Sequence, residues 1–273
     1  MSSDTEEETI EQASAAGNLT LVQDWVQRLS VYRGTALEES MLQSLEFSLA
    51  EAGRHGHPAK FSYLLDQGLP IDKDVIGSAK SVENFQALLE HGWDINFQDL
   101  GGSTSLRSSK NLKNADVVRW LLEHGAHPNI RDRRGYTALD YASYKYSLEV
   151  VKLLVQHGAD IKNTSAIHGA VANSIKFVPV NPGCLDIVTY LLECGADINQ
   201  LWPIMPDVYE RPHITPSTGT PLHSAVEGEN PESVRYLLSR GADRSIKGYL
   251  GMTPLEVAES DGLDEIAVIL REK

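Results

Sequence analysis

Two histidines occupy positions at which this sequence could support acid–base chemistry. His168 and His223 each stand fourth in a short phrase that opens a predicted helix, Ser165-Ala-Ile-His168 and Thr220-Pro-Leu-His223. An enzyme would need such groups to converge with other polar side chains in a closed cavity. The candidate catalytic residues for that case are His168, Asp140, Lys176, Tyr209, Arg211 and His213.

The sequence contains no motif for a metal or a nucleotide. It has no Cys-x-x-Cys, no His-Glu-x-x-His and no phosphate loop. Cys184 and Cys194 are the only two cysteines in the sequence, and two cysteines alone cannot form a zinc site. Their separation along one predicted helix is beyond disulfide reach, so we interpret them as unpaired buried thiols in a reducing compartment. We therefore expect no metal and no cofactor.

Composition excludes several classes of partner. The chain has 273 residues, a net charge of −14 and 41% hydrophobic residues, which is enough for a real core. An acidic chain repels phosphate backbones, so we expect no nucleic acid. The acidic start lacks the features of a signal peptide, and no apolar run approaches the ~18 residues of a membrane span. We expect no membrane association and a cytoplasmic or nuclear location.

A phrase of the form Leu-Leu-x-x-Gly recurs along the chain. Each of its glycines follows an amphipathic run with helical spacing and can end that helix in the left-handed conformation. A shorter helix lies upstream, where Thr220-Pro and Thr253-Pro combine an N-cap with a proline suited to the first turn. Gly92, Gly125 and Gly158 follow one another at intervals of 33 residues. Two helices in each 33-residue repeat make a solenoid. The anchoring glycines are Gly68, Gly92, Gly125, Gly158, Gly195 and Gly241.

These phrases resemble those of the ankyrin-repeat family. Thr220-Pro-Leu-His and Thr253-Pro-Leu-Glu are similar to its Thr-Pro-Leu-His signature, and Gly195-Ala-Asp-Ile-Asn199 is similar to its repeat ending. The resemblance implies an all-α solenoid of about eight helix pairs with short finger loops and one long finger insertion. It also implies a concave partner-binding face, and a histidine that ties adjacent repeats through backbone hydrogen bonds. We predict a single ankyrin-repeat domain over residues 1–273, with repeats near 8–30, 38–71, 72–98, 99–131, 132–163, 164–199, 217–247 and 248–273.

Departures from the 33-residue period locate the unusual features. The 24 residues from Gly68 to Gly92 imply a missing finger and a short inner helix near residues 75–80. Insertions are expected at 174–183, after an inner helix, and at 200–216, in a finger. The second insertion is rich in proline and large apolar residues, so we expect Trp202 and Tyr209 to pack toward the concave face near His168.

Two functions remain open at this point. The first is a scaffold that binds a protein or peptide in the concave groove, where an Arg133-Arg134 and Lys145 cluster would favour an acidic partner. The alternative is a small-molecule binder or enzyme, for example of cyclase or isomerase type, whose pocket is walled by the two insertions. The candidate binding residues are Arg133, Arg134, Tyr136, Tyr144, Lys145, Asn173, Trp202, Met205 and Tyr209.

Overall fold

The computed structural model describes residues 18–29, 31–34, 36–145, 147–172, 183–203 and 218–272. Those ranges contain helices, turns and irregular segments but no β-strand, which confirms the expected all-α class. Within them, no helix is long and apolar enough to cross a membrane. The chain divides into two compact units, residues 1–99 and 100–273.

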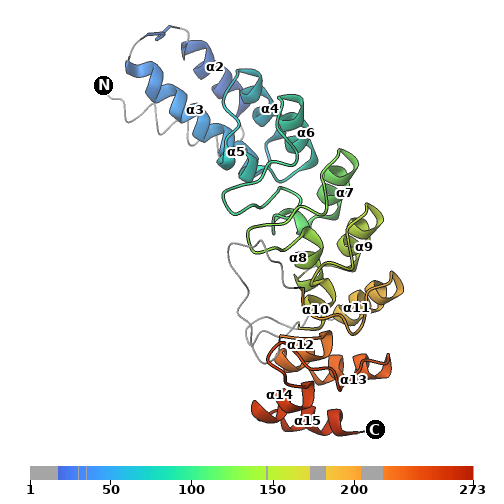
Figure 1. Ribbon diagram of the computed structural model, residues 1–273. Helices are drawn as coiled ribbons and strands as arrows, with labels where there is room; N and C mark the ends of the chain where they lie inside the picture. The colour runs from blue at the N-terminus through green and yellow to red at the C-terminus, as the bar shows by residue number, and fades with distance from the viewer. Residues whose placement is uncertain are drawn as a thin grey trace. The chain divides into compact units, whose positions relative to one another are not determined.

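The first unit is built from helices in two rows (Figure 1). Helix α3 packs against α4 and α5, while α4 packs against α2 and α6. The short α5 begins at the N-cap Asp72, whose carboxylate accepts the N–H groups of Asp74 and Val75. It confirms the short inner helix expected near residues 75–80. The described helices of this unit are α2 (Leu19–Leu29), α3 (Ala36–His55), α4 (Pro58–Asp66), α5 (Lys73–Ser78) and α6 (Val82–Glu90).

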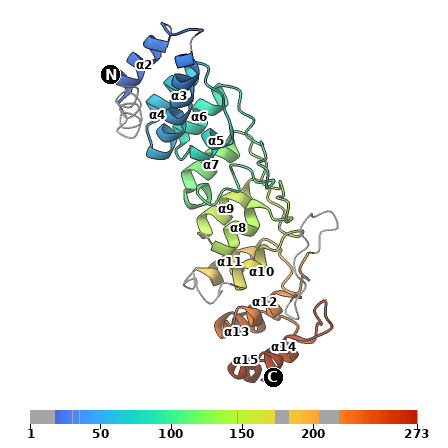
Figure 2. The ribbon, with the colours of Figure 1, turned by 90° about the vertical axis from the view of Figure 1, so that its left-hand side faces the viewer.

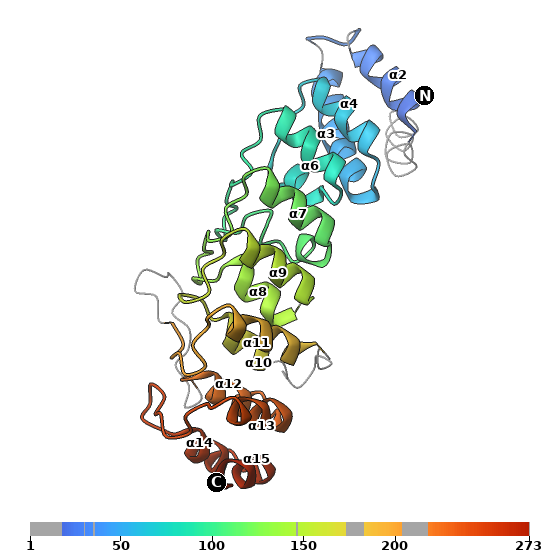
Figure 3. The same cartoon turned by 90° about the vertical axis from the view of Figure 1, so that its right-hand side faces the viewer.

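The second unit repeats a pair of helices along its length. Helices α8, α10, α12 and α14 pack on one another in sequence as the inner row, and each packs on the outer helix that follows it. Its finger loops project to one side of the unit (Figures 2 and 3). The elements are the 3-10 helix η1 (Asn111–Lys113) and the helices α7 (Ala115–Glu123), α8 (Ala138–Lys145), α9 (Leu148–Gln156), α10 (Ala166–Val171), α11 (Cys184–Glu193), α12 (Pro221–Glu227), α13 (Pro231–Ser239), α14 (Pro254–Ser260) and α15 (Asp264–Arg271).

The outer helices end as the sequence predicts. The six anchoring glycines have φ angles between 81° and 96°, the left-handed region that a residue with a side chain rarely adopts. The histidines before three of them cap the helix. The ring Nδ1 atoms of His91, His124 and His157 lie 2.7–2.8 Å from the carbonyl oxygens four residues earlier. A ring N–H there gives the carbonyl oxygen a second donor beside the histidine's own backbone N–H, which is a structural role at the helix end.

The repeat predicted at 99–131 differs from the expected helix pair. Its inner element consists of turns that end in η1 rather than an α-helix. The stretch from Ser103 to Ser109 is rich in serine and threonine, which favour turns over helix interiors. The side-chain amide of Asn111 donates to the carbonyl of Ser105 over 2.7 Å and so fixes the irregular backbone.

The cysteines lie at the two ends of α11. Cys184 is buried, as expected, but Cys194 is exposed at the C-cap, so the interpretation of both thiols as buried is wrong for Cys194. The amphipathic spacing of the helix turns its first residue inward and its C-cap outward. Within the described residues, no group of three or more His, Cys, Asp or Glu side chains could hold a metal ion.

Candidate functional site

In four inner elements of the second unit, the fourth residue of the phrase that begins the element links one repeat to the next. The simplest case is His223, which is completely buried in α12. Its Nδ1 lies 3.1 Å from the backbone nitrogen of Thr220, and its Nε2 lies 3.0 Å from the carbonyl oxygen of Met252 in the following finger. Burial lowers the pKa of His223, so its ring is neutral and Nε2–H donates to Met252. This is the inter-repeat tie that the family resemblance implies.

Asp140 takes the same place in α8 and accepts four hydrogen bonds, two within its own repeat and two from the next repeat. Its Oδ2 accepts the backbone N–H (2.7 Å) and hydroxyl (2.8 Å) of Thr137, and its Oδ1 accepts the N–H (2.6 Å) and hydroxyl (2.8 Å) of Ser165. Burial raises the pKa of Asp140, whereas these donors favour the carboxylate. Both oxygens are thus engaged with the protein's own groups, which is the arrangement of a structural carboxylate.

His168 is the third member of this series and has an unusual environment. It is completely buried, and its Nε2 lies between the carbonyl oxygens of Gln200 (3.0 Å) and Gly219 (3.2 Å). Its Nδ1 has no hydrogen-bond partner in the described part of the chain. The equivalent nitrogen of His223 has Thr220 beside it, but Ser165 directs both of its donors to Asp140 instead. Burial lowers the pKa of His168 to about 4, so the ring is neutral near pH 7.

The ring of Trp202 packs against His168. The two ring centroids are 5.0 Å apart with the planes inclined at 63°, which confirms the expectation that Trp202 lies near this histidine. The N–H of Trp202 donates to the carbonyl of Gly219 (2.8 Å), and the hydroxyl of Tyr249 donates to the carbonyl of Trp202 (2.7 Å). Together with the N–H of Tyr249, which donates to Thr218, these bonds join the two ends of the long finger insertion.

Several predicted residues lie outside the described ranges. All but Asn173, which directly precedes the first insertion, belong to the two insertions, and the structure gives no contacts or distances for their predicted catalytic or binding roles. These residues are Asn173, Lys176, Met205, Tyr209, Arg211 and His213. Among the catalytic candidates, the structure therefore describes Asp140 and His168, whose polar atoms serve the repeat interfaces.

The predicted arginine pair stands on an ordered finger. Asp132 accepts the N–H groups of Arg134 (2.9 Å) and Tyr136 (2.8 Å) on Oδ1, which closes the tip of the finger into a turn. The N–H of Arg133 donates to the carbonyl of Gly101 in the preceding finger over 3.0 Å. The side chains of Arg133 and Arg134 are exposed. The finger therefore holds two guanidinium groups on a backbone that is fixed at three points.

A residue that the sequence analysis did not select supports this finger. Arg107 occupies the fourth place in Thr104-Ser-Leu-Arg107, pairs with the buried Asp132 and stacks over the ring of Tyr141 at 4.0 Å from its centroid. The ring of Tyr141 in turn meets Tyr136 edge-on at 5.9 Å. Alignment of Arg107 with the fourth positions of the following inner elements would have identified it, because Asp140, His168 and His223 are polar and contact the next repeat.

The remaining predicted binding residues lie on α8 and its finger. Tyr136 and Tyr144 are half-buried, and burial raises the pKa of both phenols. Lys145 is the last residue of α8, and its side chain lies outside the described part of the structure. The finger and the end of α8 thus bring two exposed arginines and two partly exposed tyrosines to one repeat.

Comparison with known proteins agrees with this architecture. A family model described as ankyrin repeats in three copies matches residues 74–165, and a model for a single ankyrin repeat matches residues 219–249. This chain is an ankyrin-repeat protein. A solved ankyrin repeat domain of Acinetobacter baumannii AYE is similar in structure, with a TM-score of 0.51 and 21% identity over 82% of this chain and 96% of that one. At this identity the likeness shows the ankyrin fold alone.

Curated relatives share short stretches of sequence with this chain. The potassium channel AKT1 of Arabidopsis thaliana is 47% identical over 58 residues, which cover 21% of this chain and 7% of the channel. The transient receptor potential cation channel subfamily A member 1 of Homo sapiens is 43% identical over 53 residues, or 19% of this chain and 5% of that protein. The chain therefore matches less than a tenth of either relative.

Proposed function

We propose that this protein binds an acidic segment of a partner protein through the finger of residues 131–136 and the adjoining end of α8. Ankyrin repeats generally mediate protein–protein interaction, and the exposed Arg133 and Arg134 give this surface its character. Arginine and tyrosine are enriched among residues that dominate binding energy at interfaces. The one carboxylate of the finger, Asp132, is buried and paired with Arg107.

The order of the finger is the observation that carries the proposal. A flexible arginine loses conformational freedom when it binds, whereas a preorganised backbone reduces that cost. The hydrogen bonds of Asp132 and the bond from Arg133 to Gly101 supply this order before any partner is present. A guanidinium group also binds a carboxylate with two parallel hydrogen bonds, which suits an acidic partner.

An enzymatic or small-molecule function has less support. Of the residues on which it would depend, Asp140 is saturated with hydrogen bonds and His168 is buried, neutral and engaged with two carbonyls. Because no observation in the described residues favours it, protein binding is the function that we propose.

The test compares partner capture by three forms of the full chain in cells. The first is the natural chain, the second carries Arg133→Glu and Arg134→Glu, and the third carries Arg119→Glu and Arg235→Glu. Arg119 and Arg235 are exposed on outer helices α7 and α13, so the third form has the same charge change away from the finger. We expect the second form to lose partners that the other two retain, and those interactions to weaken as salt rises. Equal capture by all three forms would reject the finger as the binding surface.

A further inference from the structure

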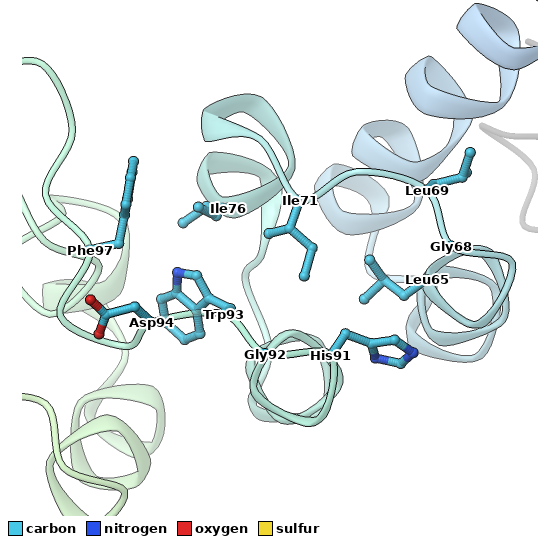
Figure 4. Close-up of a pocket in the computed structure, with 10 residues that line it drawn as sticks. All are labelled: Leu65, Gly68, Leu69, Ile71, Ile76, His91, Gly92, Trp93, Asp94 and Phe97. Atoms are coloured by element: carbon cyan, nitrogen blue, oxygen red, sulfur yellow. The ribbon is translucent and has the colours of Figure 1, made fainter.

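The first unit contains a pocket of about 430 Å³ at the place where a finger is missing (Figure 4). Only four residues, Leu69 to Asp72, separate Gly68 from α5, whereas eleven separate Gly125 from Thr137 in the complete finger. The pocket lies between the end of α4, the helix α5 and the segment that follows α6. Its walls include Leu65, Ile71, Ile76, Trp93, Asp94 and Phe97.

The missing finger explains why the pocket is open. In the second unit, neighbouring fingers cover each other, as the hydrogen bond from Arg133 to Gly101 shows. The segment after α6 has no complete finger before it, so the side that a preceding finger would cover is left bare. The side chain of Phe97 is 42% exposed as a result, although it is a large apolar group beside the pocket.

The lining of the pocket is apolar and its surroundings are acidic. Leu65 and Ile71 face each other across it in Figure 4, with the indole of Trp93 on the opposite wall from Leu65. The polar side chains of the lining are the exposed Asp94 and His91, whose Nε2 lies 3.1 Å from Oδ1 of Asp66. Residues 64–99 contain seven carboxylates and two lysines. A cationic partner therefore gains electrostatic attraction near this pocket, and an anionic one is repelled.

Hydrogen-bond donors without partners point to a peptide occupant. The indole Nε1–H of Trp93 is buried and has no acceptor in the described residues. The backbone N–H groups of Leu69 and Ile71, in the shortened loop, also donate to no atom of those residues. Carbonyl oxygens of an extended peptide can accept such donors, as they do when a strand is added to an exposed edge.

We propose that this pocket binds a partner peptide that places a large apolar side chain, such as Leu, Met or Phe, in the cavity with Lys or Arg beside it. The apolar side chain fills the space of the missing finger, and the cation lies near Asp94. The site is separate from the finger of residues 131–136, which the proposed function assigns to an acidic partner.

The experiment selects random twelve-residue peptides displayed on phage against the immobilised full chain. Selected peptides are synthesised and their affinities measured for the natural chain and for Ile71→Trp, which fills the half-buried rim of the pocket with a larger side chain. Asp94→Asn removes the charge while the side-chain oxygen still accepts the N–H of Asn96. Asp74→Asn, an exposed carboxylate in the first turn of α5, is the matched control. Thermal melting establishes that each variant is folded.

We expect the selected peptides to pair a large apolar residue with Lys or Arg. Ile71→Trp should weaken their binding at least tenfold and Asp94→Asn several-fold, with no change for Asp74→Asn. Selected peptides that bind Ile71→Trp as tightly as the natural chain, or that are acidic, would overturn the inference, as would the absence of any peptide sensitive to Ile71→Trp. If binding of every selected peptide depends instead on Arg133 and Arg134, this inference fails while the proposed function stands.

Discussion

Acid should destabilise this protein through His168, and substitution by glutamine should remove that sensitivity. The imidazole is completely buried, and its pKa is lowered by burial from 6.5 to about 4. A proton added at Nδ1 would create a buried N–H without an acceptor, because Ser165 already donates to Asp140 and no other partner is in place. His168→Gln retains a side-chain donor for the carbonyls of Gln200 and Gly219 but cannot be protonated in this range.

The size of the effect follows from proton linkage. Above about pH 7.5 the imidazole is neutral in both the folded and the unfolded chain, so it contributes no pH dependence there. As pH falls through 6.5, this histidine binds a proton in the unfolded chain but not in the folded chain. The free energy of unfolding therefore decreases until about pH 4. The lost free energy of unfolding reaches roughly 3 kcal/mol at the acid limit and about 2 kcal/mol at pH 5.

The assay is urea unfolding at pH 8 and pH 5, followed by helix circular dichroism. The difference in unfolding free energy between the two pH values should be about 2 kcal/mol larger for the natural chain than for His168→Gln, since other titrating groups contribute equally to both. His124→Gln, which changes an exposed helix-capping histidine, is the control. If His168→Gln showed the same pH dependence as the natural chain, the assignment of a buried, unprotonated ring would be refuted.

Three further outcomes test the architecture. Asp140→Ala should cost about 3 kcal/mol because four donors lose their acceptor, whereas Glu256→Ala, whose bonds are exposed and lie within its own repeat, should cost less; urea unfolding measures both. Gly219→Ala should lower the melting temperature, since its Cβ would lie 2.7 Å from the ring of His223, while Gly77→Ala has open space and should melt at the same or a higher temperature. Replacing residues 204–217 with a short turn should change stability by less than about 1 kcal/mol, because the hydrogen bond between Trp202 and Gly219 and the two bonds of Tyr249 hold the ends of the insertion together. A large loss on calorimetry would contradict this.

Much of the fold could be predicted because its signals are periodic. A glycine with a left-handed backbone ends an outer helix wherever the Leu-Leu-x-x-Gly phrase occurs, so one local rule located six helix ends. Thr253 and Pro254 likewise begin α14 where the sequence places its N-cap and first turn. The inner element before α7 was wrongly predicted as an α-helix. Thr104-Ser-Leu-Arg107 matches the spacing of a helix start, but it forms turns. Threonine and asparagine side chains there bond the backbone locally and compete with helix formation.

The candidate site was harder to predict, since residue type alone does not show what a polar group contacts. Arg133 and Arg134 were predicted to bind a partner because they are charged and because the family pattern places them on a finger, where side chains are expected to be exposed. Their support was missed, because Arg107 lies 26 residues before Arg133 and meets Asp132 only through the stacking of adjacent repeats. Contacts between repeats have no fixed offset when fingers are shortened or lengthened.

The chemistry of the inner elements explains why this chain contains catalytic residue types in positions that favour structure. Each repeat buries polar backbone groups against its neighbour, and a buried polar group is costly unless it is paired. Arg107, Asp140, His168 and His223 each occupy the fourth place of an inner element and each pairs with a group of the next repeat. Glu256 occupies that place in the last inner element and bonds only within its own repeat. A guanidinium, a carboxylate and an imidazole thus perform the same structural task. In the next repeat, the guanidinium pairs with a carboxylate, the carboxylate with two donors, and the imidazole with a carbonyl oxygen. Nδ1 of His168 has no partner in the described residues because Asp140 accepts both donors of Ser165, the serine that would otherwise face the ring.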